Sequence, residues 1–290
     1  MSAGPSYTPA VGVVTVSYGS AEVLDQFLAS VAGATSGAVA MVVADNKAPD
    51  REAERIADRA GAHYLPLPRN GGYGAGMNSA VAVLPAEVEW VLISNPDVSL
   101  GAGAIDALLA CAVSDPTIGA VGPAIITDNV VYPSARSIPS LRTGVGHALF
   151  ANIWVANPWT RSYRRDSESE PVRREAGWLS GACLLVRRSA FVKLGGFDAK
   201  YFMYFEDVDL GYRLGNEGLK NIYEPAATVV HLGAHSTDAD SARMIEAHHQ
   251  SARRFLSRKY AGWHLWPVRV ILTVGLSIRS ATLRRRATHH

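Results

Sequence analysis

Two polar segments carry the residue types that metal-dependent chemistry needs. The apolar run EWVLIS is followed by Asn95, Pro96 and Asp97, and His231 follows the apolar run TVV. SNPDV can simply be a turn, because Pro96 fixes its φ angle and the neighbouring Asn95 and Asp97 favour turns. A carboxylate and a neutral imidazole, completed by a ligand's phosphate oxygens and water, also suit Mg²⁺ or Mn²⁺. A structural role for His231 is the alternative to ligation.

A second group of acids lies among aromatic residues in the segment FMYFEDVDLGYR. Acids in an apolar setting bind protons more tightly, as a general base working near neutral pH requires. The same acids also suit the first turn of a helix, where they interact favourably with the helix dipole. On such a helix, Glu206 and Asp209 share one face and Asp207 points elsewhere.

Alternating strand-like and helix-like segments must position these residues. We predict strands at 11–18, 38–46, 63–67, 89–94 and 118–126, and helices at 21–31, 51–60, 76–84 and 103–113. This alternation is typical of an α/β domain with a mostly parallel sheet covered by helices, in which ligands bind at the carboxyl ends of strands. The polar residues at the predicted strand ends are Thr15, Ser17, Tyr18, Asp45, Asn46, Arg69, Asn70, Asn95 and Asp97.

Each of these strand-end signals has a structural alternative. Asp45 can bind a ribose or a base edge, or form an N-cap or Asx turn with Asn46. Thr15 and Ser17 also fit a half-buried strand. The segment RNGGYGAGMN is either a flexible turn into a helix or a backbone cradle for a ligand. The loop SYGSAEV contains neither of the two common nucleotide-binding glycine motifs.

The remaining chain is less regular at first and then helical. We expect an irregular excursion over about 127–171, a strand at 177–188, a short helix at 205–218, one or two strands at 221–233, and a helix at 243–260. Two cysteines, both in apolar runs, favour buried thiols in a reducing compartment. The N-terminus lacks the pattern of a secretion signal, and no apolar run approaches the roughly 18 residues of a spanning helix. We therefore expect a cytoplasmic protein.

The charge is distributed unevenly along the 290 residues. Nine of the 28 basic residues and none of the 26 acidic residues follow residue 250, which leaves the preceding part with 19 basic residues and a net charge of −7. Trp263, Trp266, Arg269 and Arg284–Arg286 make this tail similar to an interfacial segment for anionic lipid. A solvated helix or a subunit contact is the alternative. Only the tail has more basic than acidic residues, and this argues against nucleic acid as a partner of the body.

Five ordered pieces between about Val11 and Ser236 together resemble the family-2 inverting glycosyltransferases of the GT-A fold. They are VTVSY, VVADN, RNGGYGAGMN, SNPDV, and the segment GWLSGACLLVRRSAFVKLGGFDAKYFMYFEDVDLGYR with the later HLGAHS. The resemblance implies a GT-A domain over 1–240, with a nucleotide-binding half at about 10–126 and an acceptor half at about 172–236. A helical, basic extension that is able to contact a membrane follows at 241–290.

The resemblance also implies a role for each matching residue. It makes Asp207 the catalytic base and makes Asp97 and His231 the ligands of a divalent cation, Mg²⁺ or Mn²⁺. Many relatives have Asp where this chain has Asn95. The implied nucleotide-sugar site comprises Thr15, Ser17, Tyr18, Asp45, Asn46, Arg69, Asn70 and Asn95. The implied acceptor and sugar pocket comprises Trp178, Gly181 and Glu206.

Within the family, bacterial rhamnosyltransferases are the most similar. They imply dTDP-L-rhamnose as the donor, polyprenyl-diphosphate-linked N-acetylglucosamine as the acceptor, and a role in cell-wall linker synthesis at the inner face of the cell membrane. Transfer of another sugar, or to another acceptor, is the main alternative. A non-catalytic sugar-nucleotide-binding protein at the membrane is a further one. A nucleotidyltransferase would need a glycine-rich basic loop where this chain has SYGSAEV. The sequence does not indicate an oligomeric state.

Overall fold

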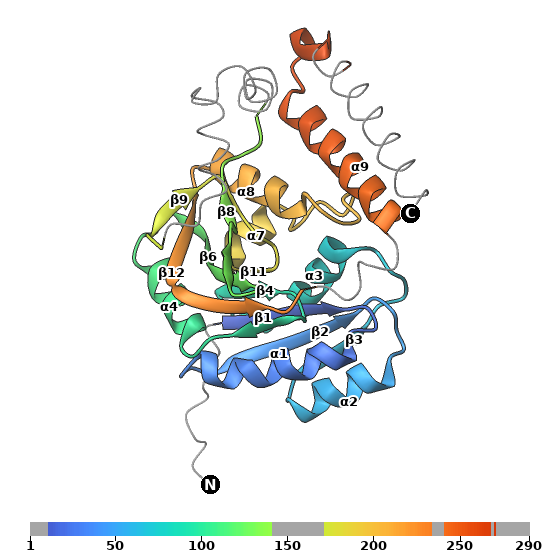
Figure 1. Ribbon diagram of the computed structural model, residues 1–290, viewed down its shortest axis with the longest axis vertical. Coiled ribbons are helices and arrows are strands. Elements are labelled where there is room, and N and C mark those ends of the chain that lie inside the picture. The colour runs from blue at the N-terminus through green and yellow to red at the C-terminus, as the bar shows by residue number, and fades with distance from the viewer. Residues whose placement is uncertain (1–10, 141–170, 234–240, 268–269, 271–290) are drawn as a thin grey trace.

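The computed structural model describes residues 11–140, 171–233, 241–267 and 270 (Figure 1). The first half of the chain contains β1 (Val11–Ser17), α1 (Ala21–Ala34), β2 (Val39–Asp45), α2 (Arg51–Arg59), β3 (His63–Pro66), α3 (Tyr73–Ala82), β4 (Trp90–Ser94), β5 (Val98–Leu100), α4 (Ala104–Val113), β6 (Ile118–Thr127), β7 (Val130–Tyr132) and β8 (Ala135–Arg136). The second half contains β9 (Arg174–Ala176), β10 (Trp178–Leu179), β11 (Cys183–Arg187), α7 (Arg188–Lys193), α8 (Glu206–Asn216), β12 (Lys220–His231), α9 (Ser241–Lys259) and the 3₁₀ turn η2 (Trp263–Leu265).

A ten-stranded sheet forms the centre of the described structure, and its main path has the order β3-β2-β1-β4-β11-β6-β12-β5. The strands β3, β2, β1 and β4 are parallel to one another. Antiparallel pairing begins at β11, which lies between β4 and β6, whereas β12 is again parallel to β6. The predicted α/β class is confirmed. The parallel strands place the carboxyl ends of β1, β2 and β4 at one edge of the sheet.

Helices cover both faces of this sheet (Figure 1). One apolar cluster joins the sheet to α1, α2 and α4, and another joins it to α3, α7 and α8. Successive strand side chains supply the two clusters, because side chains alternate across a strand: Val13 belongs to the first and Val14 to the second. On α1 the buried residues Leu24, Phe27, Leu28 and Val31 repeat with helical spacing and form the face against the sheet.

Several elements differ from the sequence prediction. The helix α3 begins at Tyr73, three residues before the predicted start, because Gly74 and Gly76 are buried against Phe197 and Val16. Packing there outweighs the low helix propensity of glycine. The segment 177–188 is two short strands separated by a loop. The strand β5 was not predicted. Part of the expected irregular excursion forms β7 and β8, while 141–170 lie outside the described residues.

The helix α9 confirms the helix predicted at 243–260 and packs against the folded body. Its buried Phe255 contacts the rings of Phe205 and Tyr212, with centroids 5.9 and 5.8 Å apart. This helix therefore packs against the α/β body, and the domain boundary predicted after residue 240 stays a prediction. The residues Arg269 and Arg284–Arg286 of the expected interfacial tail lie outside the described residues. Among the described helices, none combines the length and apolarity that crossing a membrane requires.

Candidate active site

The ends of β1 and β2 lie side by side, since Ser17 pairs with Asp45 in the parallel register. The side chains of Thr15, Ser17 and Asp45 are fully buried. The hydroxyl oxygen of Thr15 has no hydrogen-bond partner among the described residues, and the same is true of the side-chain oxygen of Asn46. The Asn46 amide nitrogen donates to the carbonyl of Gly72, at 3.1 Å, which ties β2 to the start of α3.

Asp45 shapes the loop that follows β2. Its carboxylate accepts hydrogen bonds from the backbone N–H groups of Lys47 and Asp50, at 2.8 and 3.1 Å, and from the Tyr64 hydroxyl at 2.6 Å. The bond to Lys47 is the expected Asx turn. These bonds fix the carboxylate in place, and its binding of a nucleotide stays a prediction.

The other predicted nucleotide-site residues lie at the surface of the same edge. Tyr18 is 54% exposed, and the Lys47 ammonium lies 5.9 Å from the centre of its ring. Arg69 and Asn70 are exposed on the loop after β3. The Asn70 side chain accepts a hydrogen bond from the Gly72 N–H at 2.9 Å, so it shapes the glycine-rich loop. The edge thus combines a buried polar floor with exposed aromatic and cationic groups.

The SNPDV segment is both a turn and the location of a candidate metal site. The residues Asn95–Asp97 connect β4 to β5, and His231 at the end of β12 pairs with Val98 of β5. This pairing brings His231 Nε2 to 3.1 Å from Asp97 Oδ1, with only 22% and 13% of the two side chains exposed. The two predicted metal ligands, 134 residues apart in the chain, are therefore neighbours.

This pair fits a divalent cation that is completed by a substrate. Two ligands at adjacent positions of an octahedral cation, each about 2.1 Å from it, lie about 3 Å apart. The separation of Asp97 Oδ1 and His231 Nε2 matches this value, although it is equally the length of a hydrogen bond. Within the described ranges, no group of three or more histidine, cysteine or acidic side chains forms a metal site. The pair leaves the other positions for phosphate oxygens and water.

Asp207 is held in a defined orientation by two backbone donors. Its Oδ2 accepts from the Gly181 N–H at 2.9 Å, and its Oδ1 accepts from the Val208 N–H at 2.8 Å. Burial raises the pKa of Asp207, and these backbone hydrogen bonds oppose the rise. Each oxygen retains a lone pair that can accept another proton, as a general base requires.

The neighbouring acids have different surroundings. Burial raises the pKa of Glu206, and the charge of Asp207 raises it further. The Glu206 atom Oε2 has no hydrogen-bond partner in the described structure. By contrast, the fully buried Asp209 is bound by Arg213 Nε at 2.6 Å and by Arg258 Nη1 at 3.0 Å. Asp209 is therefore structural, whereas Glu206 and Asp207 belong to the candidate site.

The short loop between β10 and β11 joins Asp207 to the SNPDV turn. Gly181 donates to Asp207, and the carbonyl of the next residue, Ala182, accepts from the Asn95 N–H at 2.9 Å. The Tyr73 hydroxyl donates to the Gly181 carbonyl at 2.5 Å. Burial and then the charges of Glu206 and Asp207 raise the pKa of Tyr73 well above its ordinary value. A single three-residue loop thus fixes Asp207 and the SNPDV turn relative to each other.

The loop before α8 is conformationally strained. Tyr204 and Phe205 both have φ of 68°, a region that non-glycine residues rarely adopt. The loop also contacts the glycine-rich segment, where Tyr73 N–H donates to the Phe202 carbonyl at 3.1 Å. Gly72, with φ of 87°, passes so close to this carbonyl that an added Cβ would lie 2.1 Å from its oxygen. Only glycine fits here.

Trp178, predicted to line the acceptor pocket, packs beside α8. Its indole N–H donates to the Ser137 carbonyl at 3.1 Å, and its backbone approaches Gly211 of α8 closely. Tyr73 was not predicted as a site residue, although it lies in the glycine-rich segment RNGGYGAGMN. A large aromatic residue between glycines was the available signal. The strained pair Tyr204 and Phe205 gave no local signal.

Two solved structures, each containing a nucleotide or nucleotide sugar and Mn²⁺, are similar to this fold. The chain is similar to the mannosyltransferase PcManGT from Pyrobaculum calidifontis, solved with GDP-Man and Mn²⁺, with a TM-score of 0.59 and 18% identity over 98% of this chain and 76% of that chain. It is also similar to GalNAc-T7, solved with UDP, GalNAc and Mn²⁺, with a TM-score of 0.58 and 14% identity over 79% of this chain and 44% of that one. The architecture is therefore that of the GT-A glycosyltransferases.

Sequence comparison specifies the family. Residues 9–253 match the family described as "Glycosyltransferase like family 2", and the chain belongs to this family. It is 45% identical, over 96% of its length and 94% of the relative's, to an N-acetylglucosaminyl-diphospho-decaprenol L-rhamnosyltransferase from Mycobacterium tuberculosis. It is 27% identical, over 86% of its length and 93% of the relative's, to the rhamnosyltransferase WbbL of Escherichia coli K12. The predicted family and fold are confirmed.

Proposed function

We propose that this glycosyltransferase transfers L-rhamnose from dTDP-L-rhamnose to N-acetylglucosaminyl-diphospho-polyprenol, with inversion at the anomeric carbon, as a step of cell-wall linker synthesis. The observation that carries this choice of substrates is the 45% identity along almost the whole chain to the mycobacterial L-rhamnosyltransferase. The arrangement of Asp207, Gly181 and the SNPDV turn supports the chemistry.

Asp207 is the proposed general base. The hydrogen bonds from Gly181 and Val208 fix its carboxylate, so that a free lone pair can take the proton of an acceptor hydroxyl. The oxygen of that hydroxyl attacks the anomeric carbon of the donor, the bond to the nucleoside diphosphate breaks, and the diphosphate leaves with the electron pair. A single displacement of this kind inverts the configuration.

Asp97 and His231 would hold a divalent cation, Mg²⁺ or Mn²⁺, against the diphosphate of the donor. When bound, the cation offsets the negative charge that develops on the leaving diphosphate. The short separation and partial burial of the two side chains support this assignment. Asn95 directly precedes Pro96 in the same turn and would contact the same part of the donor.

The remaining predicted residues divide between the two substrates. The nucleotide would bind at the edge formed by β1, β2 and β3, using the residues Thr15, Ser17, Tyr18, Asp45, Asn46, Arg69 and Asn70. The acceptor sugar would bind near Trp178, Gly181 and Glu206. A lipid-linked acceptor implies peripheral association with the inner face of the cell membrane, and the exposed Trp263 and Trp266 after α9 support such contact.

A donor panel tests the proposal directly. The full chain is incubated with Mg²⁺ or Mn²⁺, a short-chain polyprenyl-diphosphoryl N-acetylglucosamine, and in turn dTDP-L-rhamnose, UDP-sugars or GDP-mannose. Nucleotide release and product mass are measured. We expect a product heavier by one deoxyhexose with dTDP-L-rhamnose alone. Transfer from another donor only would retain the mechanism and reject rhamnose, whereas donor binding without any transfer would favour a non-catalytic sugar-nucleotide-binding protein.

A further inference from the structure

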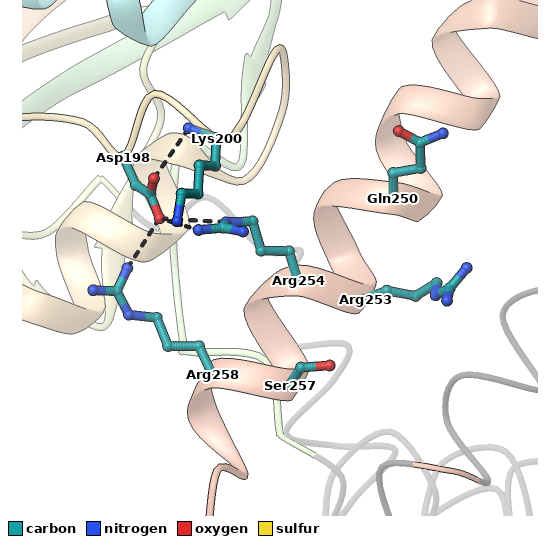
Figure 2. Close-up of a pocket in the computed structure, with 7 residues that line it drawn as sticks. All are labelled: Asp198, Lys200, Gln250, Arg253, Arg254, Ser257 and Arg258. Carbon is teal, nitrogen blue, oxygen red and sulfur yellow. Dashed lines mark hydrogen bonds and ion pairs between the residues drawn. The ribbon is translucent and has the colours of Figure 1, made fainter.

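A basic pocket lies between α9 and the loop that connects α7 to α8 (Figure 2). Its volume is approximately 840 Å³. Four of the seven lining residues are cationic and one is a carboxylate; the full lining is Asp198, Lys200, Gln250, Arg253, Arg254, Ser257 and Arg258. This pocket contains none of the residues assigned above to the donor, the cation or the acceptor.

Two of the four cationic side chains form ion pairs with the carboxylate of Asp198. Arg254 Nη2 and Arg258 Nη1 lie 2.8 and 3.3 Å from Asp198 Oδ2 (Figure 2). Lys200 and Arg253 are exposed, and within the described part of the chain neither side chain has an ion-pair partner. Arg253 projects from α9 on the side away from Asp198 (Figure 2). The pocket therefore has an excess of positive charge on groups that are free to bind an anion.

The pocket lies on the opposite side of α8 from the catalytic base. Arg258 contacts both Asp198 of the pocket and Asp209 of α8. Asp207 and Asp209 are two residues apart on this helix, which rotates their side chains about 200° relative to each other. Asp207 accordingly faces Gly181, whereas Asp209 faces α9.

This position decides between two sources of a phosphate group. In the proposed acceptor, the diphosphate is attached to the same sugar that carries the reacting hydroxyl, so it must lie on the Asp207 side of α8. A phosphate bound in the basic pocket must come from another molecule. The pocket residues of α9 precede Trp263 and Trp266, which are 84% and 59% exposed, and tryptophan is enriched where proteins meet the lipid headgroup layer.

We propose that this pocket binds the phosphate of an anionic phospholipid headgroup and so holds α9 against the membrane. Arginine and lysine are suited to phosphate binding. One guanidinium group can donate two parallel hydrogen bonds to phosphate oxygens, and an ammonium group supplies a compact positive charge. Peripheral membrane association is part of the proposed function, on which this proposal rests. The new element is that residues of α9 and its neighbouring loop make the contact with the lipid. It does not depend on the identity of the donor sugar.

Vesicle binding of the full chain tests the pocket. The double variant Lys200→Gln/Arg253→Gln removes the two unpaired charges and leaves both ion pairs of Asp198 in place. Partitioning is measured by cosedimentation with vesicles of phosphatidylcholine, with and without phosphatidylglycerol. We expect roughly 30-fold weaker partitioning to the anionic vesicles, about fivefold for each charge removed. Equal partitioning of the wild type and this variant would overturn the proposal.

A matched control separates the pocket from net charge. Arg55 and Arg59 on α2 are 74% and 64% exposed, and Arg55→Gln/Arg59→Gln removes the same charge from a distant surface. We expect this control to bind vesicles almost as the wild type does. An equal loss in both double variants would show that only net charge matters and would refute the pocket.

A third measurement distinguishes the two phosphate sources and is independent of vesicle binding. For Lys200→Gln/Arg253→Gln, the KM for a water-soluble short-chain acceptor is expected to stay at the wild-type value. A tenfold rise in this KM, with unchanged vesicle binding, would assign the pocket to the acceptor and overturn the phospholipid proposal. If no donor supports transfer, the proposed function fails while vesicle binding still tests the pocket.

Discussion

Replacing Asp207 by asparagine tests the catalytic assignment with little change in shape. Asparagine has nearly the same volume, and its single side-chain oxygen can keep the hydrogen bond from either Gly181 or Val208. The other N–H loses its acceptor, which costs about 1–3 kcal/mol of stability. Removing a buried charge works in the opposite direction, because burial raises the pKa of Asp207. We therefore expect a folded enzyme with a melting temperature near that of the wild type.

The expected loss of turnover is far larger than this structural effect. Removing a general base lowers the rate by about 10²- to 10⁴-fold, or roughly 3–5 kcal/mol of activation free energy. Binding of dTDP-L-rhamnose should be almost unchanged, since the proposed role of Asp207 is to take a proton from the acceptor hydroxyl. Initial rates give kcat, and calorimetry gives the donor Kd.

A control variant makes this comparison specific. Glu217→Gln removes one negative charge at the other end of α8, where Glu217 pairs with the exposed Lys193, and should leave kcat unchanged. Turnover of Asp207→Asn within tenfold of the wild type would remove Asp207 from the role of base. A parallel loss of donor affinity would instead indicate a role in donor binding.

Three further predictions concern the surroundings of Asp207. Burial raises the pKa of Glu206 from 4.5 to about 8, so deprotonation of the unfolded chain destabilises the fold in this pH range. Glu206→Gln should therefore raise Tm by an amount that is small below pH 4.5, grows up to about pH 8 and is constant above it. Thermal unfolding across pH that shows no such trend would contradict the burial argument. Asp97→Ala should weaken cation-dependent donor binding by at least about tenfold, as measured by calorimetry with and without Mn²⁺. If the variant keeps both donor binding and activity, SNPDV is only a turn. Gly72→Ala forces a Cβ against the Phe202 carbonyl at an unfavourable φ. We expect this variant to lose about 2–4 kcal/mol of unfolding free energy, measured with denaturant, and to have a lower kcat. A loss of unfolding free energy below about 1 kcal/mol would mean that this loop adapts easily.

The sequence predicted the parts of the site that depend on local patterns. Apolar runs ending in polar residues placed Ser17, Asp45 and Asn95 at strand ends, and parallel pairing then required these ends to share one edge. The resemblance to a known family added the pairing of Asp97 with His231, which no local pattern supplies across 134 residues. The structure brings them together because β12 pairs with β5, a strand too short for its period to be recognised.

Contacts between distant segments account for what was missed. The orientation of Asp207 depends on the backbone N–H of Gly181, and backbone groups carry no sequence signal. The hydroxyl of Tyr73 reaches Gly181 across 108 residues. The body contact of α9 was equally hidden, because basic residues at 254 and 258 look solvated in sequence, whereas their guanidinium groups bind Asp198 and Asp209.

Contacts of α9 connect the basic pocket to the strained loop before α8. Two consecutive positive φ angles at Tyr204 and Phe205 cost about 1–3 kcal/mol each, so the surrounding structure must hold the loop in place. The helix α9 supplies part of that support: Ser251 donates to the Met203 carbonyl at 2.9 Å, and the ring of His248 packs against both strained residues. The chain passes directly from this loop into the turn that carries Asp207. If a phospholipid binds the basic pocket and stabilises α9 as proposed, it would therefore also favour the loop conformation that positions Asp207.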